Sequence, residues 1–158
     1  MIVFALLSLA IIAWEVFGFT EGLGLSSSSQ WWTRLTYQCC HDGILHACLN
    51  VYCLMMMAYR WRLRLSELAT AVAIAALVPS FLLSERCVVG LSGALFAVFG
   101  MRSVYAENFL KFNLQVALVI ALGFLFENAA SWLHLYAYVA GMVFGMINKP
   151  IEWKDMNR

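Results

Sequence analysis

Six long apolar segments follow one another along this chain, and they limit the folds that it can adopt. The first, residues 2–20, contains Glu15 as its only charged residue. Runs of this length are typical of bilayer-crossing helices, because a hydrocarbon core of about 30 Å needs about 20 helical residues. The segment lacks a basic stretch ahead of it and a clear cleavage site, so we expect a retained helix rather than a signal peptide. The remaining segments are 41–59, 66–84, 92–106, 110–126 and 130–148.

Composition agrees with this interpretation. The chain has 158 residues, of which 63% are hydrophobic and only 12% are charged. Soluble domains carry about 25% charged residues, so this chain has too few to cover a water-facing surface. We therefore expect an all-α membrane protein, a six-transmembrane-helix bundle forming a single domain over residues 1–158. Its expected surroundings are a lipid bilayer, and no basic aromatic patch indicates a nucleic acid partner.

Basic residues predict the orientation of the bundle. Arg60, Arg62 and Arg64 follow the second segment, and the positive-inside rule places such a loop in the cytoplasm. Six alternating spans then put both termini in the cytoplasm. This orientation leaves only Arg34 and Arg86 outside and places the other eight of the ten basic residues inside. The expected location is an integral, multi-pass position in a plasma (inner) membrane.

The fourth segment is too short to cross a bilayer. Counted from Ser92 to Glu107 it spans roughly 22 Å at 1.5 Å per residue, which places Ser92 inside the membrane. Non-helical backbone must then reach it, and such backbone is tolerated at depth only when it is buried or lines a wet cavity. Gly90 and Gly93 leave room around the Ser92 hydroxyl. A serine at a helix N-terminus in such a cavity is a candidate nucleophile, because helix amides stabilise an oxyanion there.

His134 in the sixth segment is the candidate base for this serine. It lies fifteen residues before Lys149, the same span that separates Ser92 from Glu107, so both side chains are expected at about the same depth. Small residues recur after His134 and along the fourth segment, and they favour close contact of the two helices. The two small-residue faces are Ala137, Gly141 and Gly145, and Gly93, Ala97 and Gly100.

His46 and Asn50 lie four residues apart and therefore share one face of the second helix. Two buried polar side chains are costly in lipid unless they serve a cavity. They are expected either to donate to a developing oxyanion or to fix helix packing. The five cysteines are odd in number and form no C-x-x-C pair, so we interpret them as small apolar residues. No metal and no cofactor is expected.

Four patterns occur in order along the chain. They are Trp32-Thr33-Arg34; His41, His46 and Asn50; Gly90-Leu91-Ser92-Gly93-Ala94; and His134 with Ala137 and Gly141. Together they resemble the rhomboid family of intramembrane serine proteases, with its W-R, H-x-x-x-x-H-x-x-x-N, G-x-S-G-A and H-x-x-G-x-x-x-G patterns. The resemblance covers essentially the whole chain as a minimal six-helix core, with Ala137 in place of the first glycine after the histidine.

The resemblance implies a function and roles for individual residues. Ser92 would be the nucleophile and His134 the general base, a dyad without an aspartate. His46, Asn50 and the Ser92 amide would form the oxyanion hole. The supporting residues would be Gly90, Gly93, Phe96 (packed on the histidine ring), Ala137 and Gly141. The substrates implied are transmembrane segments of other membrane proteins, cut near the outer face of the membrane.

Two alternatives remain open. Aligning the sixth segment on Ala140-Gly141 and Gly145 puts Tyr138 at the position of the base. That register would make the chain an inactive pseudoprotease that binds membrane clients. The second alternative is a small metal or proton transporter that uses His41, His46 and His134. The chain shows no internal repeat of the transporter type.

Overall fold

A computed structural model describes residues 1–18, 22–126 and 130–148 of the chain. Within these ranges the protein is all-helical, which confirms the all-α part of the predicted fold class. An isolated β-bridge joins Leu25 to Val88. The elements in chain order are α1 (Ile2–Phe17), α2 (Thr33–Thr36), α3 (Ile44–Arg60), α4 (Leu65–Ala76), the 3-10 helix η1 (Ser80–Leu82), α5 (Ser92–Ser103), α6 (Phe109–Gly123) and α7 (Ser131–Ile147).

Helix bounds differ from the expected segments chiefly at the third and fourth helices. The third segment was expected to run over 66–84, but α4 ends at Ala76. Pro79 explains this early end, because a proline disfavours helical backbone at the residue before it, and the chain continues as η1. The fourth helix begins at Ser92 as expected and ends at Ser103 rather than at residue 106. Residues 19–20 of the first expected segment and the polar tail from Lys149 lie outside the described residues.

The helices are short for membrane spans. The longest, α3 and α7, have 17 residues each. Among the described residues, no helix combines the length and the apolar character that crossing a membrane demands. The expectation of six transmembrane helices is therefore not confirmed by these helix bounds.

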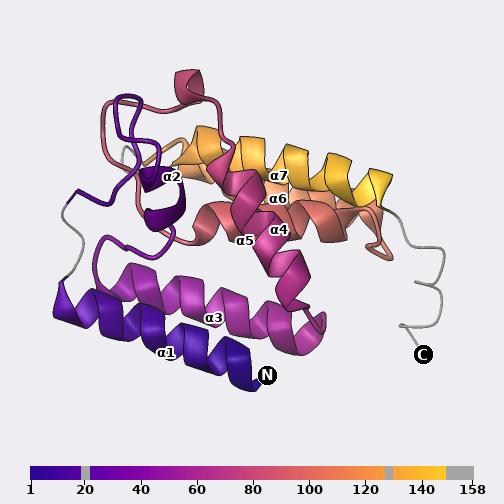
Figure 1. Ribbon diagram of the computed structural model, residues 1–158. Coiled ribbons are helices and arrows are strands. Elements are labelled where there is room, and N and C mark those ends of the chain that lie inside the picture. The colour runs from indigo at the N-terminus through magenta and orange to yellow at the C-terminus, as the bar shows by residue number, and fades with distance from the viewer. Residues whose placement is uncertain (19–21, 127–129, 149–158) are drawn as a thin grey trace.

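Helix α5 forms the centre of the molecule. It packs against α7, α4, α3 and α6, whereas α1 lies along α3 at one edge (Figure 1). Nine of the twelve residues of α5 are buried. Its apolar side chains join those of α3 and α4 in the main core, which also includes the fully buried Ala137 of α7. The first residue of α5 is therefore held by a helix that is surrounded by protein.

Glycines allow α5 and α7 to approach closely. A Cβ atom on Gly100 would collide with the backbone of Tyr138, and one on Gly141 would collide with the backbone of Ala97. Gly145 likewise lies against the backbone of Met101. The predicted contact between the two small-residue faces is thus confirmed, and Ala137 does not hold the helices apart.

Two loops are held together at the end of the molecule where α5 begins. The backbones of Leu25 and Val88 exchange hydrogen bonds of 2.9 and 2.7 Å. The Ser27 hydroxyl donates to the Glu85 carboxylate at 2.6 Å. Arg34 of α2 donates to the Ala76 and Val78 carbonyls, which connects α2 to the end of α4. These contacts fix the segment that leads into Ser92.

Candidate active site

The hydroxyl of Ser92 and the imidazole of His134 meet at the N-terminal ends of two helices. Ser92 is the first residue of α5, and His134 lies in the first turn of α7. The Ser92 Oγ and His134 Nε2 atoms are 2.8 Å apart, which is a hydrogen-bond distance. The close approach of α5 and α7 therefore brings the predicted serine and histidine together. This geometry suits removal of the serine proton by the imidazole.

Phe96 holds the imidazole ring in place. It lies one turn after Ser92, and its ring stacks on that of His134 with centroids 4.4 Å apart and an interplanar angle of 27°. Both residues are half-buried and face the same cavity. The contact between Phe96 and the histidine that the resemblance implied is present.

Tyr138, the alternative candidate for the base position, lies one turn later and points elsewhere. Its hydroxyl donates to Oδ1 of Asn113 on α6. Its ring packs with Val116 and Ile120 of the same helix. The structure therefore places His134 at Ser92 and directs Tyr138 towards α6.

Gly90 shapes the backbone just before the serine. Its φ angle is +124°, a conformation that residues with a side chain rarely adopt. A Cβ atom at this position would lie 2.8 Å from Cε1 of His46 and 3.0 Å from its Nε2. The same atom would lie 3.6 Å from Oγ of Ser92. The absence of a side chain at Gly90 therefore lets the His46 ring lie against the backbone just before Ser92. Both His46 and Ser92 line the same cavity.

The tautomer of His46 follows from the hydrogen bond that its Nδ1 atom accepts. The Asp42 backbone N–H donates to Nδ1 of His46 at 3.4 Å. Because Nδ1 accepts, a neutral ring carries its proton on Nε2. That Nε2–H lies beside Gly90, on a side chain that lines the same cavity as Ser92. The part of His46 in an oxyanion hole stays a prediction.

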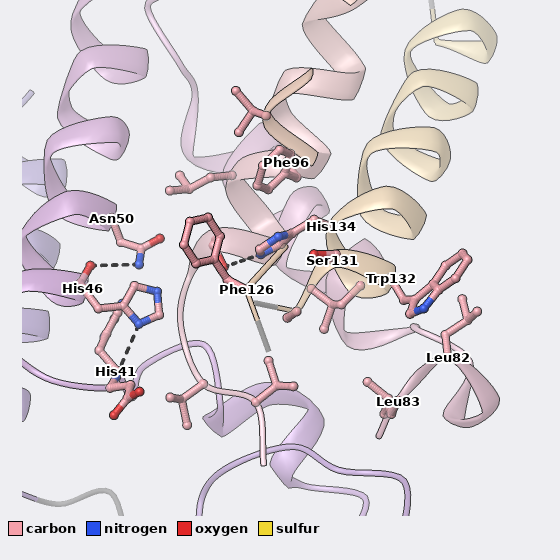
Figure 2. Close-up of a pocket in the computed structure, with 18 of the residues that line it drawn as sticks. His41, His46, Asn50, Leu82, Leu83, Phe96, Phe126, Ser131, Trp132 and His134 are labelled. Atoms are coloured by element: carbon pink, nitrogen blue, oxygen red, sulfur yellow. Dashed lines mark hydrogen bonds between the residues drawn. The ribbon is translucent and has the colours of Figure 1, made fainter. Parts of the chain in front are cut away.

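Asn50 lies on the same face of α3 as His46, as its spacing predicted, and it lines the same cavity (Figure 2). Its side chain is buried and donates through Nδ2 to the His46 carbonyl at 3.0 Å. An amide group carries two N–H bonds, so one remains available to a ligand. The structure does not bring Asn50 into contact with Ser92, and its part in an oxyanion hole stays a prediction.

Two further residues, Tyr37 and His41, hold the serine loop. The Tyr37 carbonyl accepts the Gly90 N–H at 2.9 Å, and its hydroxyl donates to the Ala75 carbonyl at 3.3 Å. Burial raises the pKa of the Tyr37 phenol well above its ordinary value, so the hydroxyl remains a donor. His41 accepts the Leu91 N–H on its Nε2 at 3.4 Å. The histidine pattern pointed to His41, but nothing in the sequence pointed to Tyr37.

A cavity of about 1510 Å³ opens in front of the serine and histidine. His46 and Asn50 of α3 border it on one side and His134 of α7 on the other (Figure 2). Most of the remaining wall is apolar, with contributions from α3, η1, α6 and α7 that include Leu49, Leu82, Phe112, Val116 and Trp132. Pockets for small ligands measure about 300–1,000 Å³, so this cavity suits a larger guest such as a peptide segment.

Comparison with known proteins gives one family. A family model described as the Rhomboid domain matches residues 28–151. The matched range contains every residue placed at the site above, from Tyr37 to His134. The comparison with curated proteins gave no match.

Proposed function

The chain belongs to the rhomboid family, and on this premise we propose that it is an intramembrane serine endopeptidase. The family generally comprises serine proteases associated with membranes. The observation that carries the proposal is the 2.8 Å separation between Ser92 Oγ and His134 Nε2. The proposed substrates are transmembrane segments of other membrane proteins.

In the proposed reaction Ser92 and His134 act as a dyad. The imidazole takes the Ser92 proton while Oγ attacks the scissile carbonyl, and it then gives that proton to the leaving amine. Water next attacks the acyl-enzyme, with His134 again acting as the base. The stacked Phe96 ring supports the imidazole orientation that both steps need.

The oxyanion of the tetrahedral intermediate would be stabilised by donors from α5 and α3. One is the backbone N–H of Ser92 at the N-terminus of α5, where the helix dipole favours negative charge. Another is His46 Nε2–H, whose tautomer the Asp42 amide sets. Asn50 offers a third donor from the same helix face. Preorganised donors of this kind are typically the largest contribution to such catalysis.

The outer surface of the molecule supports a membrane location. Large apolar side chains are exposed along α1, α3, α6 and α7, where water would penalise them and lipid would not. Examples are Ile2, Leu6 and Leu9; Leu45 and Leu49; Leu110, Leu114 and Leu118; and Val139, Val143 and Met146. We propose an integral position in the plasma (inner) membrane, as one domain with both termini cytoplasmic and the cavity at the outer face.

Cleavage of a transmembrane reporter by the purified full-length protein tests the proposal. Ser92→Ala removes the nucleophile and should abolish cleavage, and His134→Ala should lower its rate by about 10²–10⁴-fold. The exposed Ser66 offers a matched control, and Ser66→Ala should cleave at the wild-type rate. Wild-type cleavage by a folded Ser92→Ala variant would refute the proposal.

A second candidate is a pseudoprotease that binds membrane clients without cutting them. Ala137 motivates it, because the family has a glycine at that position in its H-x-x-G pattern. This candidate predicts that clients crosslink to the wild-type protein and are never cleaved. The same reporter assay, with crosslinking added, separates it from the protease.

A further inference from the structure

Glu15 is an ionisable side chain that the proposed reaction does not use. Glu15 is the only charged residue of α1. Its Oε1 atom accepts the backbone N–H of Gly43 at 3.0 Å. Its Oε2 atom is buried and, within the part of the chain that the structure describes, has no hydrogen-bond partner. A carboxyl group on an apolar helix is costly, and such groups usually have a function.

Glu15 contacts the N-terminus of α3, which has no cap of its own. Gly43 is the N-cap residue, without a side chain and with φ +89°, and no acidic residue lies in the first turn. The first N–H groups of a helix lack partners within the helix, and the dipole there favours negative charge. Glu15 supplies both an acceptor and a negative charge from the neighbouring helix α1.

The capped end of α3 is also the end that carries His46. The residue before Gly43 is Asp42, whose N–H donates to His46 Nδ1. Glu15 therefore holds the amide next to the one that orients the imidazole. A chain of contacts runs from Glu15 through Gly43 and Asp42 to His46, which lines the same cavity as Ser92.

We propose that Glu15 is a positioning residue of the active site. By capping α3 from α1, its carboxylate keeps the His46 ring in place as the proposed oxyanion donor. The inference deepens the proposed function and rests on it insofar as His46 acts as an oxyanion donor. Glu15 touches neither substrate nor the reacting atoms, and it acts only through the N-terminus of α3.

Three substitutions in the full-length protein test the inference, with cleavage of the transmembrane reporter as the first readout. Glu15→Ala removes the acceptor and should lower kcat roughly 10- to 100-fold, with KM changed by less than about threefold. Glu15→Gln keeps an acceptor oxygen at the same reach and should restore kcat to within about fivefold of wild type. Glu15→Asp shortens the side chain by one methylene, so its carboxylate no longer reaches the Gly43 N–H and kcat should fall. This charged variant tests the inference even if Glu15→Ala does not fold.

Ser8 offers a matched control on the same helix. Ser8 is buried on α1, as the Oε2 atom of Glu15 is. Unlike Glu15, it accepts no hydrogen bond from α3, because its hydroxyl has no hydrogen-bond partner among the described residues. Ser8→Ala should therefore leave kcat, KM and the thermal unfolding midpoint at wild-type values. A loss of kcat in this control as large as in Glu15→Ala would overturn the inference, since any change in α1 would then disturb the site.

Hydrogen exchange of the backbone amides of residues 43–47 gives a second readout that needs no activity. Glu15→Ala should speed exchange of the Gly43 amide, and Glu15→Gln should leave it slow. Unchanged exchange and unchanged kcat in Glu15→Ala would overturn the inference, as would a Glu15→Gln variant as impaired as Glu15→Ala. An inactive wild-type protein would refute the proposed protease function, while the exchange result would still decide whether Glu15 caps α3.

Discussion

At the scale of single residues, the site depends on Gly90 as much as on the residues with reactive groups. Its positive φ angle and the closeness of the His46 ring both exclude a side chain. Its N–H is also fixed by the Tyr37 carbonyl, so the loop cannot shift easily to make room. The His46 ring that lies against Gly90 is the proposed donor to the substrate carbonyl oxygen.

Gly90→Ala should therefore lower the rate of reporter cleavage by about 100-fold or more, because it displaces His46 or the serine loop. Gly18→Ala is the matched control. Gly18 also has a positive φ of +72°, but a Cβ atom there would meet nothing within 4 Å. Gly18→Ala introduces backbone strain alone, whereas Gly90→Ala adds crowding of the site. Comparing the cleavage kinetics of the two variants therefore separates the two effects. Equal rates for Gly90→Ala and wild type would contradict this account.

Ser92 and His134 were predictable from the sequence because helix-length arithmetic and small-residue spacing pointed to them. Tyr37 was not, for a physical reason. It holds Gly90 through its main-chain carbonyl, a group that every residue has, and only the fold shows which carbonyl lies there. The bond from Asn50 to its own helix was similarly hidden, because spacing places a side chain on a face without saying what it binds.

At the scale of elements, the contact of α5 with α7 brings the dyad together. The helices touch backbone to backbone at Gly141 and Ala97. Since Ser92 and His134 lie at the same end of these helices, any widening of the contact separates their side chains.

Gly141→Leu should therefore abolish cleavage and destabilise the fold by about 1–3 kcal/mol, the usual cost of overpacking. Val139→Leu, at an exposed position on α7, should change neither cleavage nor stability. Thermal unfolding in detergent together with reporter cleavage measures both effects. A Gly141→Leu variant with wild-type stability and activity would show that the close contact is not needed.

The long apolar segments predicted six helices, but they did not predict all of the helix ends. The end of α4 at Ala76 depends on Pro79 and on Arg34, which reaches from another segment to bind the last carbonyls. Contacts of this kind between distant segments are absent from local sequence patterns. The short helix α2, which falls between the first two expected segments, was missed for the same reason.

At the scale of the whole molecule, the proposed orientation puts the cavity and its loops on the outer side of the membrane. Cys87 is an exposed free thiol in the loop before Ser92. Arg62 is exposed in the connection between α3 and α4, at the opposite end of α3 from the cavity.

A membrane-impermeant thiol reagent tests this orientation in intact cells. It should label a variant that retains only Cys87. In a variant without native cysteines, Arg62→Cys should be labelled only after the membrane is permeabilised. The reverse pattern would contradict the proposed topology, and labelling of both before permeabilisation would contradict a membrane barrier between them.

The central claim is that His134 makes Ser92 a nucleophile. The most direct measurement is the mass of the purified protein after reaction with a fluorophosphonate, with peptide mapping of the modified residue. The account predicts one adduct, located on Ser92, and its absence from Ser92→Ala. It also predicts that labelling of His134→Ala is slower by about 10²–10⁴-fold. A folded wild-type protein whose Ser92 stays unmodified, or one labelled as fast without His134, would contradict it.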